Sequence, residues 1–387
     1  MKARGPWHDY PRALRELLRR EPQSLPMVAA KLGWCRARHG LGPRDFFDFE
    51  LRHRPTSTWR DYLSDVPHMR RIMRALHPEH VARLANDKVL STERLMERGV
   101  PVAPVYVVAG RDTQSHPAGG RLSVVNDAAA LRRWLEGAPD RLFCKPATGS
   151  FGNGVFRAHR DGAHWRVGGI SMSAAAFAEH LLGQDDRSGT LVSPELRNHP
   201  ALAPIAADLG LSATRVYTAY TTTGIEIFCT IQKVMTTPAL ADNFHDGSTG
   251  HLLCFIDPEN GCITRAYGRD PDDQIRLSTY ETHALTGAHF TGFPIPFWNE
   301  ILEVARAATE AMPELPLPGL DIALTETGPV MLESNAYCFA IAPQLQFGGL
   351  RPILESLLPR LAVDPERRDD ALWALRTGEP GARRNMH

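Results

Sequence analysis

Residues 319–335 constrain the fold of this chain more than any other stretch. They read GLDIALTETGPVMLESN, so two apolar runs of β-forming residues flank a Glu-Thr-Gly turn. This pattern predicts a β-hairpin. Asp321 lies on its first strand, and Glu333 and Asn335 lie on its second strand. Because successive side chains on a strand point to opposite faces, Glu333 and Asn335 share a face.

The three polar side chains of this hairpin form a candidate metal site. Mg²⁺ takes oxygen ligands, often one or two carboxylates, and keeps its other positions for water and phosphate. The alternative is that the two acids are solvated residues on an exposed face. Both are embedded in apolar runs, however, where an unpaired carboxylate would be costly. The sequence therefore predicts that Asp321, Glu333 and Asn335 hold Mg²⁺, with Mn²⁺ as an alternative, beside a nucleoside triphosphate.

A glycine-rich segment at residues 141–155 is a second candidate binding element. It reads RLFCKPATGSFGNGV, so a short apolar strand ends near Lys145 and glycines follow at 149, 152 and 154. Glycines allow positive φ angles and let backbone N–H groups approach a phosphate, and a lysine adds a point charge. The loop lacks the Gly-Lys-Ser/Thr ending of a Walker A loop. It also lacks a Gly-x-Gly-x-x-Gly sequence opening a helix. Taken alone, it is also compatible with an ordinary hairpin.

Taken together, these segments resemble the ATP-grasp superfamily. Asp87-Lys88 opens an expected helix that leads to GVPVAP at 99–104, similar to the DK…G(I/V)PVP segment of these enzymes. The strand lysine with its glycine loop follows, and then the acid with its Glu-x-Asn, in the order that is typical of the superfamily. The resemblance implies that one set of residues binds ATP: Lys88, Lys145, Ser150, Phe151, Gly152, Gly154, Val192 and Glu195. The last two stand in the place of the adenine hinge, although its usual glutamate has no clear counterpart here.

The middle of the chain resembles the catalytic part of the glutamate-adding ATP-grasp ligases. Residues 213–220 and 225–231 predict a hairpin around Thr223-Gly224. Those ligases carry DIRV in this place, followed by a second basic residue after the next strand. Arg215 matches the first, and Lys233 stands where an arginine is usual. Residues 239–250 resemble their N-x-x-x-GG loop with one glycine displaced, so the resemblance implies catalytic roles for Arg215, Lys233 and Asn243.

Three further segments narrow the resemblance to one branch. Residues 41–49, 60–64 and 197–202 are similar to sequences of the sugar-transfer-associated ATP-grasp proteins. That branch implies a setting in surface-glycan or secondary metabolism. It does not imply a particular substrate, because acceptor pockets are built from variable loops.

The fold that we expect is α+β, with two α/β subdomains that grip ATP, preceded by a helical N-terminal region. Apolar residues recur at helical spacing near the start, which predicts helices over residues 1–80. We expect the first ATP-grasp part, with its glycine-rich loop, at 81–190. The C-terminal part with the metal site should span 191–365, and a flexible tail should occupy 366–387.

Composition excludes several other classes. Lysine plus arginine equals aspartate plus glutamate, at 44 each, so no basic field points to nucleic acid. No apolar run approaches a membrane span, and residues 1–7 lack a signal-peptide core. The six cysteines show no C-x-x-C spacing, which favours reduced core thiols. No H-x-H or H-E-x-x-H spacing points to zinc. We therefore expect a cytoplasmic protein, whose oligomeric state, including a homodimer, stays open.

The function implied by the resemblance is an ATP-dependent carboxylate–amine ligase. Such an enzyme passes the γ-phosphoryl group of ATP to a carboxylate, and an amine then attacks the acylphosphate. Its partners would be a small-molecule carboxylate and an amine, and it would release ADP and phosphate. Two alternatives stay open at this point. One is an ATP-dependent kinase on the same fold, and the other is a non-catalytic nucleotide-binding partner in glycan assembly.

Overall fold

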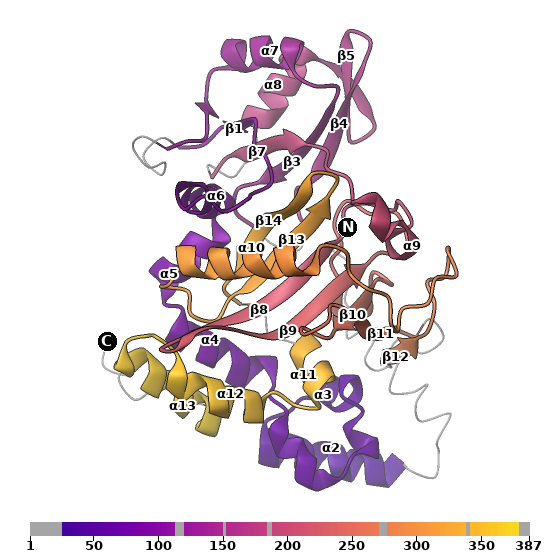
Figure 1. Cartoon of the computed structure of the whole chain (residues 1–387), viewed down its shortest axis with the longest axis vertical. Coiled ribbons are helices and arrows are strands. Elements are labelled where there is room, and N and C mark those ends of the chain that lie inside the picture. Colours follow the sequence, from indigo (N-terminus) through magenta and orange to yellow (C-terminus); the bar gives the residue numbers. More distant parts are fainter. Residues whose placement is uncertain are drawn as a thin grey trace.

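Two seven-stranded sheets, one above the other along the long axis, form the frame of the protein (Figure 1). The computed structural model describes residues 25–112, 120–149, 152–183, 188–270, 277–337 and 341–378, and every structural statement below refers to them. The mixed α/β architecture and the helical N-terminal region are both as predicted. None of the described helices is long and apolar enough to cross a membrane.

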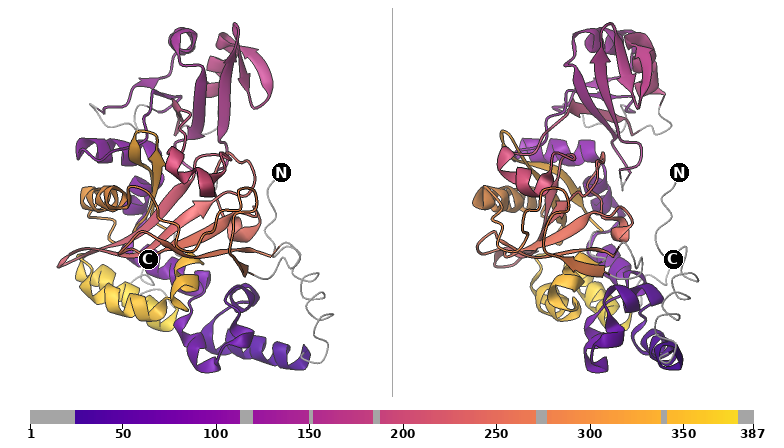
Figure 2. Two further views of the ribbon diagram at one scale, coloured as in Figure 1. Left: turned by 45° about the vertical axis from the view of Figure 1, so that its right-hand side comes forward. Right: turned by 90° about the vertical axis from the view of Figure 1, so that its right-hand side faces the viewer.

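The smaller sheet stands at one end of the molecule in all views (Figure 2). Its strand order is β2-β1-β7-β3-β4-β5-β6. The strands are β1 (Val107–Ala109), β2 (Val124–Val125), β3 (Arg141–Pro146), β4 (Phe156–Asp161), β5 (His164–Val167), β6 (Ile170–Ser173) and β7 (Thr190–Pro194). Helices α7 (Ala128–Gly137) and α8 (Ala174–Leu182) pack Leu131 and Phe177 against its core. Asp127 caps α7 by accepting a hydrogen bond from the Ala130 N–H at 2.7 Å.

The larger sheet has the order β12-β11-β10-β9-β8-β13-β14. Its strands are β8 (Ala213–Thr221), β9 (Gly224–Val234), β10 (Leu252–Ile256), β11 (Ile263–Arg269), β12 (Leu277–Tyr280), β13 (Gly319–Thr325) and β14 (Gly328–Asn335). The two predicted hairpins, β8–β9 and β13–β14, are both present and antiparallel, and β10–β11 forms a third. In β8–β9 the last paired residues are Thr221 and Gly224, and in β13–β14 they are Thr325 and Gly328, so two residues connect the strands of each hairpin.

Helices cover both faces of the larger sheet (Figure 1). On one face, α5 (Glu79–Asn86) and α10 (Trp298–Ala311) pack against apolar residues of β8, β13 and β14. On the other face, α4 (Arg70–Leu76), α12 (Arg351–Leu357) and α13 (Pro365–Thr377) cover β8 and β9. The sheet is therefore the middle layer of a three-layer arrangement.

The helical N-terminal region has a core of its own. Helices α2 (Leu25–His39) and α3 (Pro43–Asp48) surround a buried cluster that contains Phe46 and Trp59. The N-terminal region ends where Leu63 contacts α11 (Ala342–Phe347).

The remaining elements of the protein are short helices: η3 (Leu51–His53), η4 (Thr56–Asp61), η5 (Asp65–Met69), α6 (Lys88–Glu97), η7 (Pro200–Leu202), α9 (Ala203–Ala206), η8 (His245–Gly247) and η9 (Leu358–Arg360).

The C-terminal segment corrects one expectation. Residues 366–377, which we expected to belong to a flexible tail, form most of helix α13. Ala371, Ala374 and Leu375 are fully buried on α4 and the larger sheet, and this burial stabilises the helix. Asp364 caps it by accepting from the Glu366 N–H at 2.8 Å. The rest of the expected tail, from residue 379, lies outside the described residues.

Gln344 fastens the N-terminal region to the body of the protein. Its fully buried side-chain amide donates to the Leu63 carbonyl at 2.8 Å, and its Oε1 accepts from the Leu63 N–H at 2.6 Å. A buried backbone group that loses its partner pays a desolvation penalty of about 1–3 kcal/mol. The two bonds therefore hold segments that are far apart in the sequence.

We expect Gln344→Ala to lower the free energy of unfolding by about 2–4 kcal/mol, because it leaves both Leu63 backbone groups buried without partners. Urea unfolding followed by circular dichroism measures this change. Gln346→Ala is the matched control on the same helix, since its side chain is less buried and accepts a hydrogen bond from the Cys229 thiol instead of holding backbone groups of Leu63. An equal loss in both variants would contradict the role of Gln344.

Candidate active site

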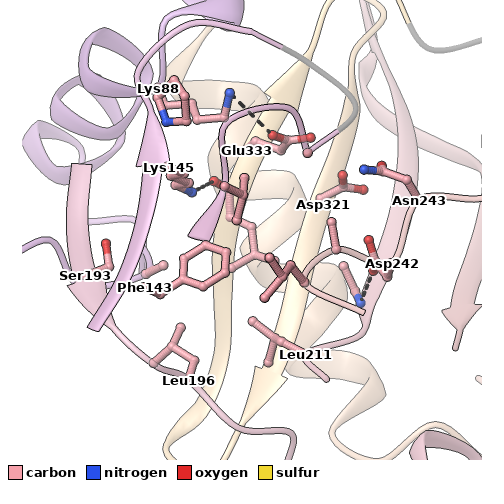
Figure 3. Close-up of a pocket in the computed structure, with 18 of the residues that line it drawn as sticks. Lys88, Phe143, Lys145, Ser193, Leu196, Leu211, Asp242, Asn243, Asp321 and Glu333 are labelled. Atoms are coloured by element: carbon pink, nitrogen blue, oxygen red, sulfur yellow. Dashed lines mark hydrogen bonds and ion pairs between the residues drawn. The ribbon is translucent and has the colours of Figure 1, made fainter. Parts of the chain in front are cut away.

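One pocket is lined by residues from both sheets (Figure 3). Its walls come from β3 and β7 of the smaller sheet and from β13, β14 and the segment after β9 of the larger sheet. Eight of the residues predicted from the sequence line it: Lys88, Lys145, Gly152, Glu195, Lys233, Asn243, Asp321 and Glu333. Predicted residues more than 200 positions apart are thus brought to one site.

Strand alternation explains how the charged residues reach this pocket. Leu320, Ile322 and Leu324 pack in the core under α10, so Asp321 points to the opposite face of β13. Asp321 pairs with Arg215 of β8 on one side and with Glu333 of β14 on the other. Residues that are directly opposite on neighbouring strands are close enough to interact.

Asp321 is the centre of a buried ion-pair network. Arg215 donates to its two carboxylate oxygens at 2.6 and 2.5 Å, and Lys233 donates to Oδ2 at 3.0 Å. Lys233 also bonds Asp242 Oδ1 at 3.2 Å, and Asp242 Oδ2 accepts from the Ala213 N–H at 2.7 Å. Burial alone would raise the pKa of Asp321, but the charges of Arg215 and Lys233 outweigh it and hold this pKa well below its usual range. The network therefore keeps Asp321 charged and fixed in place, whereas burial raises the pKa of Asp242 despite the opposing charge of Lys233.

Cationic groups gather at one end of the pocket. Lys88 Nζ donates to the Gly149 carbonyl at 2.9 Å and lies 3.9 Å from Glu333 Oε2. Lys145 Nζ donates to the Leu332 carbonyl at 3.4 Å. Figure 3 shows Lys88, Lys145 and Glu333 on this side of the pocket. Two lysines facing one carboxylate leave net positive charge, which suits phosphate groups.

The pKa of Lys145 is lowered to about 8, first by burial and then by the nearby Lys88 charge, with Glu333 and Asp321 opposing the shift. Phosphates of a bound nucleotide would raise this pKa, so nucleotide binding should take up a proton above pH 8. We therefore expect ATP affinity to fall as pH rises through 8, by about tenfold per pH unit while the bound lysine stays protonated. Isothermal titration calorimetry at pH 7.5 and 9 measures this change in ATP affinity. Lys145→Arg is the control, because arginine stays charged and should flatten the dependence.

The glycine-rich loop lies across the pocket from the loop of Asn243. Gly152 has φ +71°, and a Cβ on it would come within 3.1 Å of the Ala241 Cβ and 3.4 Å of Asn243 Nδ2. Gly154 has φ +73°, and a Cβ there would lie 2.8 Å from Pro146 Cγ. Glycine is therefore required at both positions for conformation and for space. Ser150 and Phe151, which were predicted to bind ATP, lie outside the described residues.

We expect amide hydrogen exchange at Gly149 and residues 152–154 to slow when ATP and Mg²⁺ are added. The loop reaches the pocket, and phosphates would supply contacts that only an ordered loop can make. Exchange measured by mass spectrometry with and without nucleotide tests this, with peptides of α7 as internal control. Equal exchange in both conditions would count against closure of the loop over ATP.

The other end of the pocket is apolar. Phe143 projects from β3, and Leu196, Leu211 and Leu332 complete the wall, as Figure 3 shows for the first three. Such a surface suits a flat aromatic base. Val192, which was predicted to bind the cofactor, instead has its side chain in the core of the smaller sheet. Its neighbours from Ser193 to Leu196 line the pocket in its place.

Glu195 lines the pocket, as predicted, but its carboxylate is already paired. Arg157 Nε lies 2.9 Å from Oε1, and Arg141 NH1 lies 3.4 Å from Oε2. The two arginines extend from neighbouring strands, β4 and β3. A ligand group that binds Glu195 therefore meets a carboxylate with a fixed orientation.

The proposed metal ligands differ in how well they fit Mg²⁺. Glu333 fits, because its carboxylate is one-third exposed and faces the two lysines. Asp321 already accepts three hydrogen bonds out of about four lone-pair sites, which leaves room for a single metal bond. Asn335 donates to Glu333 Oε1 and the Gly319 carbonyl, both at 3.4 Å, and lies behind the pocket wall. Within the described ranges no cluster of three His, Cys, Asp or Glu residues could hold a metal, so phosphate oxygens would have to supply the other ligands.

Sequence reasoning missed Arg111, which positions Lys88. Asp87 caps α6 by accepting from the Val89 N–H at 3.0 Å, and Arg111 holds the same carboxylate at 2.9 and 3.3 Å. Arg111 is 1% exposed and also donates to the Ser188 carbonyl at 2.8 Å. No local pattern around Arg111 marks it, since its partners lie far away in the sequence. Asp242 was missed too, although its place beside Asn243 was a usable signal.

The family model described as sugar-transfer associated ATP-grasp matches residues 68–357. The chain belongs to this family. The family match covers both sheets and every predicted site residue. The architecture in Figure 1 is accordingly the ATP-grasp fold, with the helical residues 25–67 in front of the matched segment.

Three solved structures of low sequence identity are similar to parts of this chain. D-cycloserine synthetase DcsG is 15% identical, with 79% of this chain and 74% of that chain covered and a TM-score of 0.37. D-alanyl-alanine synthetase A from Vibrio cholerae is 12% identical, with coverage of 76% and 65% and a TM-score of 0.35. N5-carboxyaminoimidazole synthase from Aspergillus clavatus, in complex with ADP, is 15% identical, with coverage of 66% and 46% and a TM-score of 0.32. The chain thus spans less than half the length of that last protein, and no curated protein matches its sequence.

Proposed function

We propose that this protein is an ATP-dependent carboxylate–amine ligase that forms an amide through an acylphosphate and releases ADP and phosphate. The observation that carries the proposal is the polarity of the pocket. Lys88, Lys145 and Glu333 converge at one end, and Phe143 and Leu196 line an apolar surface at the other. A nucleoside triphosphate is polar in the same way, because its base is flat and largely apolar and its phosphates are negatively charged. Membership of an ATP-grasp family supports ATP as that nucleotide.

Each group has a role in this proposal. Phe143, Leu196 and Leu211 would contact the adenine, and Lys88 and Lys145 would bind the phosphates of the leaving ADP. Mg²⁺ would be held chiefly by Glu333, with a single bond from Asp321, and Asn335 would orient Glu333 through its hydrogen bond to Oε1. A bound Mg²⁺ would neutralise phosphate charge and orient the γ-phosphoryl group for transfer. Lys88 and Lys145 would add to that neutralisation on the side facing the smaller sheet.

The reaction needs no protein nucleophile. A carboxylate oxygen of the acceptor attacks the γ-phosphorus, and the bond between the γ-phosphorus and the bridging oxygen breaks to release ADP. The amine then attacks the acyl carbon, phosphate leaves and the nitrogen loses a proton. Phosphoryl transfer depends mainly on positioning and on charge neutralisation. Lys233 and Asn243 line the end of the pocket where the acceptor would react, and Arg215 is held beside them on Asp321. Their charges and donors suit an anionic intermediate.

The acceptor that we propose is a sugar acid or a small peptide, in a cytoplasmic setting. The family description associates these proteins with sugar transfer. Leu240 and Asn243 line that side of the pocket, so the acceptor should combine polar groups with a modest apolar surface. Mg²⁺ is the expected metal, with Mn²⁺ as a substitute.

The test is product identification by mass spectrometry. The purified protein is incubated with ATP, Mg²⁺ and pooled carboxylates and amines, and Glu333→Gln serves as the negative control. We expect one new mass that equals acid plus amine minus water, with one ADP formed per product. AMP as the stoichiometric product would overturn the mechanism, and ADP with a phosphorylated end product would identify a kinase. Nucleotide binding without any turnover would indicate the non-catalytic role.

A further inference from the structure

The loop of residues 242–250 lies between the pocket and the helical N-terminal region. It carries Asn243, which lines the pocket, and the turn η8. Backbone hydrogen bonds close it on itself: Gly247 N–H donates to the Phe244 carbonyl at 2.7 Å, and Ser248 N–H donates to the His245 carbonyl at 3.0 Å. Thr249 Oγ1 also donates to the Phe244 carbonyl, at 3.2 Å. The loop is therefore a folded unit whose position depends on what holds it.

Its first two anchors are Asp242 and Phe244. Asp242 bonds the Lys233 ammonium and the Ala213 N–H, as described above, and so ties the start of the loop to β8 and β9. Phe244 packs against two buried clusters at once. One is the cluster beneath the larger sheet, and the other is the core of the helical N-terminal region around Phe46 and Trp59. Phe244 thus joins the loop to a part of the chain that precedes the family match.

The third anchor is a buried ion pair. Arg269, at the end of β11, donates from NH1 to Asp48 Oδ1 at 2.7 Å, and Asp48 is the last residue of α3. The two side chains are 2% and 1% exposed. Gly247 lies directly on Arg269: a Cβ on Gly247, whose φ is +85°, would come within 2.7 Å of the Arg269 Cβ and 3.0 Å of its Nε. The turn η8 therefore packs directly on the Arg269 side chain.

We propose that the helical N-terminal region positions the catalytic loop, with Asp48 acting through Arg269 to fix η8 and hence Asn243. Asp48 touches no wall of the pocket, so it is a positioning residue. Because the Asp48–Arg269 ion pair is buried and hydrogen-bonded, Arg269 has one orientation, and the loop has one position in which it packs on Arg269. The effect of this position on the acceptor rests on the proposed function, whereas the anchoring of the loop does not.

Hydrogen exchange in the full-length chain tests the anchoring. We expect Asp48→Asn to speed exchange of the amides of Gly247, Ser248 and Gly250 about tenfold or more, with the amides of β13 and β14 unchanged. The matched control is Arg44→Ala, which removes another partner of Asp48, at 3.3 Å on the same helix. The Arg44 side chain is 35% exposed, and its loss leaves the ion pair of Asp48 with Arg269 in place, so the control should leave loop exchange unchanged. The proposal would be overturned if exchange of the loop amides were unchanged in Asp48→Asn, or if exchange of the amides in both sheets rose as much as that of the loop.

A second variant covers the case in which Asp48→Asn alone does not fold. Asp48→Asn combined with Arg269→Gln replaces the ion pair with two neutral amides and leaves no buried charge without a partner. The glutamine side chain is shorter than that of arginine and should still release η8. Faster loop exchange in the folded double variant therefore supports the proposal, and wild-type exchange overturns it.

Activity provides an independent readout. Binding of ADP with Mg²⁺, measured by calorimetry, should stay within twofold in Asp48→Asn, because the nucleotide end of the pocket lies on other elements. Turnover with the substrate pair found by mass spectrometry should fall at least tenfold, with the larger change in the acceptor KM than in the ATP KM. Equal changes in both KM values would contradict a positioning role for Asp48. If no substrate pair turns over, the proposed function fails, and the exchange measurements still decide the anchoring.

Discussion

Glu333→Gln should lower turnover by about 10²–10³-fold or more while the protein stays folded. This is the range seen when one group that stabilises transition-state charge is removed. Glutamine has nearly the same shape, and Glu333 is partly exposed, so packing should change little. The loss would come from weaker metal binding at the phosphate end of the pocket. Initial rates of ADP formation at several Mg²⁺ concentrations measure it.

The control for this experiment is Glu326→Gln, in the exposed turn of the same hairpin. It removes the same charge from the same element and should leave the rate unchanged. Activity retained in Glu333→Gln with wild-type Mg²⁺ dependence would remove Glu333 from the metal site.

Asp321→Asn should lower the free energy of unfolding by about 3–5 kcal/mol at pH 7, because it leaves Arg215 and Lys233 buried without their shared anion. Burial opposes ionisation of Asp321, but the charges of Arg215 and Lys233 outweigh burial and depress its pKa in the folded state. Its ionisation therefore stabilises the fold above the unfolded pKa of about 3.9, and this contribution is lost as pH falls toward the folded pKa. The difference between wild type and variant should accordingly shrink below about pH 4. Urea titrations at pH 7 and at several acidic pH values measure it.

A surface ion pair gives the matched comparison. Glu226 pairs with Arg360, and both side chains are about one-third exposed or more. Glu226→Gln should change the free energy of unfolding by only about 0–1 kcal/mol. A similar small change in Asp321→Asn would mean that the buried network contributes little to stability.

The parts of the fold that the sequence predicted are those with local patterns. Alternating apolar residues and short turns predicted the β8–β9 and β13–β14 hairpins, and Asp87 marked the start of α6. The phosphate end of the pocket was also predictable, because Lys88, Lys145 and Glu333 lie in motifs whose order is typical of one superfamily. Whether these residues bind ATP and metal stays a prediction.

The rest depended on pairs that only the folded chain brings together. Nothing near Asp321 in the sequence indicates that Arg215 and Lys233 occupy most of its lone pairs, so the sequence suggested three equal metal ligands. The expected flexible tail was wrong for residues 366–377, because the apolar face of α13 is short and acquires its stability from packing on α4 and the larger sheet. The adenine hinge was uncertain for a similar reason. In an extended strand, sequence does not say whether Val192 or its neighbours face the core.

The packing of α13 on α4 has a consequence for synthesis of the protein. Arg367 of α13 donates a hydrogen bond to the Leu76 carbonyl, and the two residues are 291 positions apart. At about 5–20 residues per second, roughly 15 to 60 seconds separate their emergence from the ribosome. During that interval the apolar side of α4, with Ile72, Met73 and Leu76, has no α13 to cover it. We therefore expect the nascent chain to be aggregation-prone until α13 is synthesised, and truncation before residue 365 would leave this side of α4 uncovered.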